Sequence, residues 1–271
     1  MRYRSALVAC VVGICLLAAA LPAAAQATNE PLTWLINVTV KPGMYDDLEK
    51  SVQTYDKPVL DKLVTDGVIT SWGFATQMVG PPSVSCIYVI TAADWSAMGK
   101  VEKAFEDYYK AMKPEESKAA MSAYLNATQP DKESSSMVRH VVFKETPGAK
   151  PNYMLRSVYK VKPGKGSTAV KMFKEYDAPL YQKLLEAGVI TGYGLAVPEL
   201  YTGAGWTHAD WVTFSDLSQM DALDKAFEEA RKAGGEALVE MYRTTWLGMV
   251  DMDAYWDSLI RFTAGGAKGA K

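Results

Sequence analysis

The stretch KPGMYDDLEKSVQTYDKPVLDKLVTDGVITSWG at residues 41–73 decides the fold, because the chain contains it twice. The second copy, KPGKGSTAVKMFKEYDAPLYQKLLEAGVITGYG, occupies residues 162–194, 121 positions later. Fourteen of the 33 aligned positions are identical without a gap. The chain is therefore built from two copies of one structural unit.

Each copy alternates strand and helix patterns. Residues 34–40 are rich in β-branched residues, which predicts a strand, and residues 45–65 place apolar side chains at helical spacing. Pro58 lies inside that helical pattern and Pro179 inside its twin, so both helices should kink there. Two more strands, a second helical region and a fourth strand follow. The order β-α-β-β-α-β predicts a ferredoxin-like α+β unit, whose antiparallel sheet carries helices on one face only.

The uncovered face of each sheet needs a partner, and the second copy can supply it. We expect the two repeats to pack sheet to sheet, about 10 Å apart, as an intrachain dimeric α/β barrel. Small and large residues alternate along residues 70–75, which predicts the small ones toward the helices and the large ones between the sheets. The small residues are Ser71, Gly73 and Ala75, and the large ones are Thr70, Trp72 and Phe74.

The chain divides into five parts. Residues 1–25 hold two arginines, an apolar run and small residues, which is typical of a cleaved secretory signal peptide. Residues 31–145 form the first repeat, 146–152 a linker, 153–263 the second repeat and 264–271 a disordered tail rich in glycine, alanine and lysine. We therefore expect an exported protein, periplasmic or extracellular, with no membrane attachment after cleavage.

Charge and cysteine content exclude several classes of protein. Removing the signal segment leaves 27 basic and 31 acidic residues, a net charge of 27 − 31 = −4 without basic clusters. Nucleic-acid binding requires the opposite balance. Cys86 is the one cysteine left, so neither an internal disulfide nor a thiolate metal cluster can form.

The segments GVITSWG at residues 67–73 and GVITGYG at 188–194, within two β-α-β-β-α-β units, resemble the dimeric α/β-barrel superfamily in its tandem form. The resemblance covers about residues 31–263. It implies a barrel with a small-molecule pocket. It leaves the activity open, because the superfamily includes cofactor-free monooxygenases, haem-degrading enzymes, haem peroxidase-like enzymes, isomerases and ligand-sensing modules.

His208 and Asp210 form the candidate catalytic pair. They lie two apart on a predicted strand and so share one face, where the carboxylate could orient the imidazole as a general base. A structural hydrogen bond or a solvated sheet edge explains the same pair. The chain has one other histidine, His140, and the spacing of the two matches no metal motif.

The pairs Tyr55-Asp56 and Tyr176-Asp177 recur in both copies and are candidate ligand-binding residues. They could bind a ligand or transfer a proton at the pocket mouth. Alternatively, the rings pack on the sheet while the carboxylates bind backbone freed before each proline.

A further candidate ligand-binding set should line the space between the sheets. It comprises Asn37, Thr70, Trp72, Phe74, Thr191 and Tyr193. An apolar cavity with few polar groups suits a cofactor-free monooxygenase-like enzyme acting on a small apolar or aromatic compound.

Two alternatives remain open. One is a non-catalytic binding or assembly module with a filled barrel interior. The other is a haem-handling protein, against which both histidines fall on predicted strands. We expect no cofactor and no metal, and a monomeric pseudo-dimer whose outer edges could support further self-association.

Overall fold

The structure is a computed structural model that describes residues 30–82, 84–200 and 205–269. The predicted signal peptide at residues 1–25 lies outside the described residues. Within them, no helix combines the length and the apolar character needed to cross a bilayer. The first repeat contains β1 (Leu32–Val38), α2 (Tyr45–Ser51), η2 (Val52–Asp56), α3 (Lys57–Thr65), β2 (Ser71–Val79), β3 (Cys86–Ala92), α4 (Trp95–Ala111), α5 (Pro114–Ala127), η3 (Pro130–Lys132) and β4 (Ser134–Glu145).

The second repeat follows the same order. It contains β5 (Tyr153–Val161), α6 (Gly166–Met172), η4 (Phe173–Asp177), α7 (Ala178–Glu186), β6 (Gly192–Pro198), β7 (His208–Phe214), α8 (Gln219–Met249) and β8 (Val250–Ala267). Helix α8 is kinked at Gly235, where φ is +73°, so it corresponds to α4 and α5 together. This conformation favours glycine because it lacks a Cβ.

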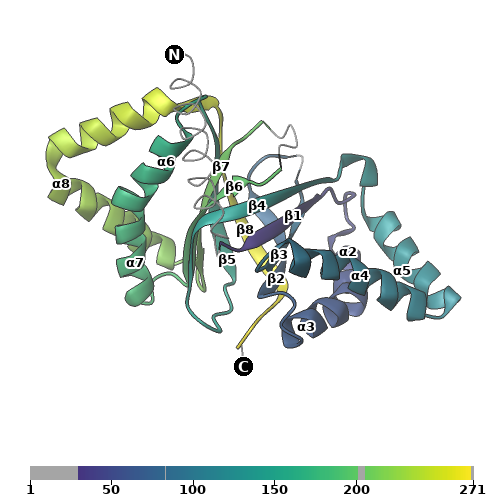
Figure 1. The fold of residues 1–271 in the computed structure, drawn as a ribbon. Coiled ribbons are helices and arrows are strands. Elements are labelled where there is room, and N and C mark those ends of the chain that lie inside the picture. The colour runs from purple at the N-terminus through teal and green to yellow at the C-terminus, as the bar shows by residue number, and fades with distance from the viewer. Residues whose placement is uncertain (1–29, 83, 201–204, 270–271) are drawn as a thin grey trace, which may run out of the picture.

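The strands of the described chain close into one antiparallel barrel in the order β1-β3-β2-β8-β5-β7-β6-β4. Each repeat supplies four consecutive strands, and the repeats join at two seams, β2 with β8 and β4 with β6. The helices of repeat one cover one side of the barrel and those of repeat two the other (Figure 1). The predicted tandem ferredoxin-like barrel is confirmed.

A π-helical turn interrupts the first helix of each repeat. These turns, η2 and η4, end at Asp56 and Asp177, and each following helix carries its proline in the first turn. A proline cannot donate the i→i−4 hydrogen bond, so the helix restarts at that point. The predicted kinks at Pro58 and Pro179 therefore take the form of π-helical turns.

The C-terminal segment differs from the prediction of a disordered tail. Residues Ala264 to Ala267 continue β8 and pair with Phe74 to Ser71 of β2. A Cβ added to Gly265 would lie 2.9 Å from the carbonyl oxygen of Trp72. The small residues of this segment were interpreted as a sign of disorder. They instead let this strand approach β2 closely.

The predicted facing of β2 is wrong. Trp72 and Phe74 pack with the helices of repeat one, whereas Ala75 packs inside the barrel with Ile87 and Ile260. The physical reason is crowding inside the barrel. A Cβ on Gly73 would lie 2.7 Å from the Phe262 ring. The small residues make room for large side chains from neighbouring strands.

Candidate functional site

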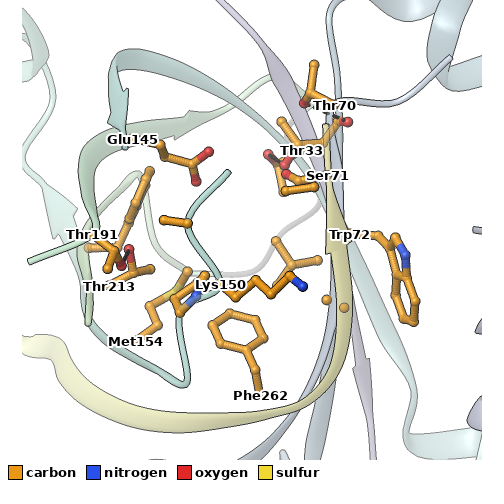
Figure 2. A pocket seen from close by; sticks show the side chains of 18 of the residues that line it. Thr33, Thr70, Ser71, Trp72, Glu145, Lys150, Met154, Thr191, Thr213 and Phe262 are labelled. Atoms are coloured by element: carbon orange, nitrogen blue, oxygen red, sulfur yellow. Dashed lines mark hydrogen bonds between the residues drawn. The ribbon is translucent and has the colours of Figure 1, made fainter. Parts of the chain in front are cut away.

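A cavity of about 630 Å³ lies inside the barrel at one of its ends. It is bounded by residues of both repeats, by the segment 146–152 that connects them and by the end of β8 (Figure 2). This volume is within the range of small-molecule sites. The barrel interior is therefore hollow at this end.

The cavity wall is largely apolar, with a few polar groups. The apolar side chains include Leu35, Ile87, Val89, Val138, Phe143, Met154, Trp211, Ile260 and Phe262. Hydroxyl groups come from Thr33, Thr70, Ser71, Thr91, Thr146, Thr191, Thr213 and Thr263, and ionisable groups from His140, Lys144, Glu145, Lys150, Arg156 and Lys268. Such a wall suits an apolar molecule with a small number of polar atoms.

His140 sits in this wall on β4, 5% exposed. The Trp211 indole Nε1 donates to His140 Nδ1 at 3.3 Å, and His140 Nε2 lies 2.8 Å from Thr33 Oγ1. Because an indole N–H can only donate, Nδ1 is the acceptor and Nε2 carries the proton. Burial lowers the pKa of His140 to about 3. The imidazole is therefore neutral, and both nitrogens are engaged.

Glu145 ends β4 and points its carboxylate into the cavity (Figure 2). Glu145 is exposed at the cavity, yet desolvation by the surrounding protein raises its pKa to about 7. Its strand partner is Gly192, where a Cβ would lie 3.0 Å from Glu145 Cγ. A carboxyl group with a pKa near neutrality is suited to proton transfer.

Arg156 lies on the interior side of β5, which also presents Met154 to the barrel. Its Nε donates to Ser258 Oγ at 3.3 Å. Burial lowers the pKa of its guanidinium to about 10, still well above neutrality. The group therefore remains a cation at physiological pH.

The predicted pocket residues divide into two groups. Thr70 and Thr191 precede β2 and β6 and line the cavity, where their hydroxyls donate to the Thr91 carbonyl and to Thr213 Oγ1. Asn37, on β1, lies outside the cavity lining and donates to Ser134 Oγ at 3.1 Å.

The large predicted pocket side chains point away from the cavity. Trp72 is among the residues that line the cavity, yet its indole lies on the outer side of the strand (Figure 2), where Nε1 donates to Asp61 of α3 at 2.9 Å. Phe74 packs 4.8 Å from the Tyr88 ring under the helices, and the Tyr193 hydroxyl donates to Gln182 of α7. These residues join helices to the sheet.

The Tyr-Asp pairs also lie outside the barrel. Asp56 accepts from the Tyr88 hydroxyl at 2.6 Å, and Asp177 accepts from the Tyr242 hydroxyl at 3.1 Å. Tyr55 is half-buried, and Tyr176 is 37% exposed with its ring against Tyr242. The carboxylates thus meet tyrosine hydroxyls, and neither one caps the backbone before its proline.

His208 and Asp210 share the helix side of β7, since Val212 and Phe214 on that face pack with the helices. His208 Nδ1 lies 2.9 Å from Thr207 Oγ1, and its ring stacks on Tyr159. Burial lowers the pKa of His208 to about 4, whereas burial and the nearby Asp177 charge raise the pKa of Asp210 to about 8. The pair is separated from the cavity by the sheet.

Sequence reasoning missed His140, Glu145 and Arg156 as site residues. Arg156 carried a usable signal, because a charged residue interrupts the mostly apolar strand pattern of residues 153–161. His140 had the same signal on its strand. Glu145 had none, since a glutamate between a strand and a Pro-Gly segment is normally solvated.

The two histidines of the described chain are both engaged by protein groups, so neither is free to hold a haem iron or a metal ion. Both nitrogens of His140 are hydrogen-bonded, and His208 contacts Thr207 and the Gly166 backbone on the outer side of the sheet. No three His, Cys, Asp or Glu side chains of the described residues gather as a metal site. The haem hypothesis therefore finds no histidine ligand in the cavity.

No protein-family model and no curated protein sequence matches the chain. Solved structures do. A "putative monooxygenase" from Fusobacterium nucleatum has a TM-score of 0.54 and 13% identity, over 89% of this chain and 96% of that one. A "putative monooxygenase" from Lactobacillus acidophilus has a TM-score of 0.57 and 10% identity, over 89% and 98%. At this level of identity the similarity concerns the fold, and the chain has the dimeric α/β-barrel fold in a single tandem polypeptide.

Proposed function

We propose that the barrel cavity binds a small, largely apolar or aromatic molecule and that the chain is a cofactor-free monooxygenase-like enzyme. The cavity carries this proposal. It combines an apolar wall of adequate volume with one carboxyl group, Glu145, whose pKa of about 7 is matched to proton transfer at neutral pH. The two similar barrels named as monooxygenases are consistent with such chemistry on this fold.

Glu145 acts as the general base in this proposal. It removes a proton from an acidic methylene of the substrate, and the apolar wall excludes water from the resulting carbanion. The carbanion passes electrons to O₂, which is the oxidant. In the balanced reaction the CH₂ group becomes C=O with one oxygen atom of O₂, and the other oxygen atom leaves as water. The protein supplies binding, orientation and the proton acceptor.

The test is oxygen consumption with 9(10H)-anthracenone, a probe chosen for its acidic methylene between two aromatic rings. The expected product with ¹⁸O₂ carries one labelled ketone oxygen. Replacing the base by its isosteric amide, Glu145→Gln, should lower kcat at least a hundredfold, because general base catalysis contributes about 10²–10⁴-fold. The control Glu236→Gln alters an exposed residue of α8. Equal rates for Glu145→Gln and wild type would refute the assigned base.

A carrier without catalysis is the second candidate, and it is favoured by the same cavity. It predicts that the probe protects the protein against thermal unfolding while no oxygen is consumed. Mass spectrometry of the protein from its native source would then identify the bound compound.

Export remains part of the proposal. Residues 1–25 have the composition of a signal peptide, and N-terminal sequencing of the mature protein should begin close to residue 26. The two seams within one chain favour a monomeric pseudo-dimer, which sedimentation equilibrium tests directly.

A further inference from the structure

Arg156 is a cation placed in the wall of a mostly apolar cavity. None of the ion pairs formed by the described residues includes it. Its one hydrogen bond within the described residues, from Nε to Ser258, leaves the two terminal nitrogens for other acceptors. Burying a charge without a counter-charge is costly, so a ligand that supplies one gains affinity.

The other ionisable groups of the cavity also favour a negatively charged ligand. Lys144, Lys150 and Lys268 line it, and Glu145 is the one acidic residue among its described lining residues. Figure 2 shows Lys150 and Glu145 on different parts of the wall. Because the pKa of Glu145 is about 7, the glutamate is only partly charged at neutral pH. The cavity therefore favours a negative ligand.

We propose that the ligand of this cavity is an aromatic or alicyclic carboxylate, held by the guanidinium of Arg156 while its rings contact Val89, Met154 and Ile260. One planar guanidinium offers two parallel N–H donors, which match one planar carboxylate. The three apolar residues belong to the hydrophobic cluster inside the barrel. This inference rests on the proposed function, because it names the ligand class of the same cavity.

The two repeats differ at this position. Leu35 of β1 occupies the place in repeat one that Arg156 occupies in repeat two, 121 residues later, and it also lines the cavity. The charged end of the ligand is therefore placed toward β5 of repeat two and away from β1 of repeat one.

Isothermal titration calorimetry with 2-naphthoate and its neutral analogue 2-naphthamide tests the inference on the mature chain. Wild type should bind naphthoate at least tenfold more tightly than naphthamide. Arg156→Met should remove this preference by weakening naphthoate binding at least tenfold, with naphthamide affinity unchanged within twofold. Arg156→Lys should keep part of the preference, because lysine retains the positive charge but lacks the planar pair of donors of a guanidinium. The matched control Arg261→Met removes an exposed arginine of β8 outside the cavity and should change neither affinity.

The outcomes separate the two proposals. Equal affinity of wild type for both probes overturns the carboxylate inference and leaves the apolar binding site in place. A preference that survives in Arg156→Met also overturns it. Failure of both probes to bind overturns the inference together with the proposed function. Thermal melting verifies folding, and Arg156→Met should melt at the wild-type temperature or above, since replacing a buried charge by a hydrophobic residue is often neutral or stabilising.

Discussion

The two repeats place a carboxylate at the end of the same π-helical turn but surround it differently. In repeat one, Asp56 receives hydrogen bonds from Tyr88 of β3 and Tyr109 of α4. In repeat two, the position of Tyr88 is taken by a second acid, Asp210 of β7, 122 residues later. A hydroxyl donor has thus been exchanged for an acceptor within one fold. The repeats therefore share their backbone arrangement, while their ionisable groups have diverged.

Copying the acid of repeat two into repeat one should have the largest effect. Tyr88→Asp removes a buried aromatic ring and puts a second carboxyl group beside Asp56. The free energy of unfolding should fall by more than about 4 kcal/mol, since the ring alone accounts for several. Urea denaturation at pH 5 and pH 8 measures it. The loss should be greater at pH 8, where both carboxyl groups ionise. An equal loss at both pH values would show that repulsion between the two carboxylates does not contribute.

Removing the acid of repeat two should stabilise the protein at high pH. The pKa of Asp210 is raised from 3.8 to about 8 and that of Asp177 to about 6, chiefly by burial. Between the unfolded and folded pKa values the folded state holds protons that the unfolded chain has lost. The free energy of unfolding therefore falls as the pH rises from about 4 to 8.

Asp210→Asn should recover roughly 2 kcal/mol at pH 9 and little at pH 5, a value set below the full pKa shift because the residue is only half-buried. Urea titrations from pH 5 to 9 follow the difference. The matched variant Asp56→Asn should gain less at pH 9, because the amide keeps one acceptor oxygen and one of the two tyrosine hydroxyls that donate to Asp56 loses its acceptor. If the difference in unfolding free energy between Asp210→Asn and wild type does not change with pH, the raised pKa assigned to Asp210 is refuted.

The smallest effect should come from single hydroxyl groups. Tyr88→Phe removes a 2.6 Å hydrogen bond to Asp56 and should cost about 1.5 kcal/mol. Tyr242→Phe removes longer bonds, 3.1 Å, to Asp177 and should cost about 1 kcal/mol. Because both variants preserve the ring, differential scanning calorimetry reports the hydroxyl contribution alone. A greater loss for Tyr242→Phe than for Tyr88→Phe would contradict the expected order of the two tyrosine–aspartate hydrogen bonds.

The duplication at residues 41–73 and 162–194 was sufficient to predict the order of helices and strands along the chain, the helix kinks and a barrel built from two repeats. The spacing of apolar positions in each helix and strand survives even where the individual side chains diverge. The facing of β2 could not be deduced in the same way. Alternation shows that Trp72 and Gly73 point to opposite sides, but the choice between sides depended on Phe262, which is distant in sequence.

The cavity itself was predictable only as a consequence of the barrel. The residues that line the cavity depend on which side of each strand faces inward. The error on β2 therefore assigned the side chains of Trp72, Phe74 and Tyr193 to the cavity and left out Ser71 and Gly73, which line it. Glu145 was beyond prediction, because its raised pKa depends on the fold around the inter-repeat segment. His208 and Asp210 were correctly predicted to share one face of a strand, and that face is directed toward the helices.

The exchange of Leu35 for Arg156 has a consequence for the symmetry of the barrel. A barrel assembled from two identical subunits has a twofold axis, so an asymmetric guest can enter it in two equivalent poses. Here one half bears the guanidinium and the other an isobutyl group, and this degeneracy is lifted. Because both halves belong to one chain, each side of the cavity can change by mutation without the same change on the other side.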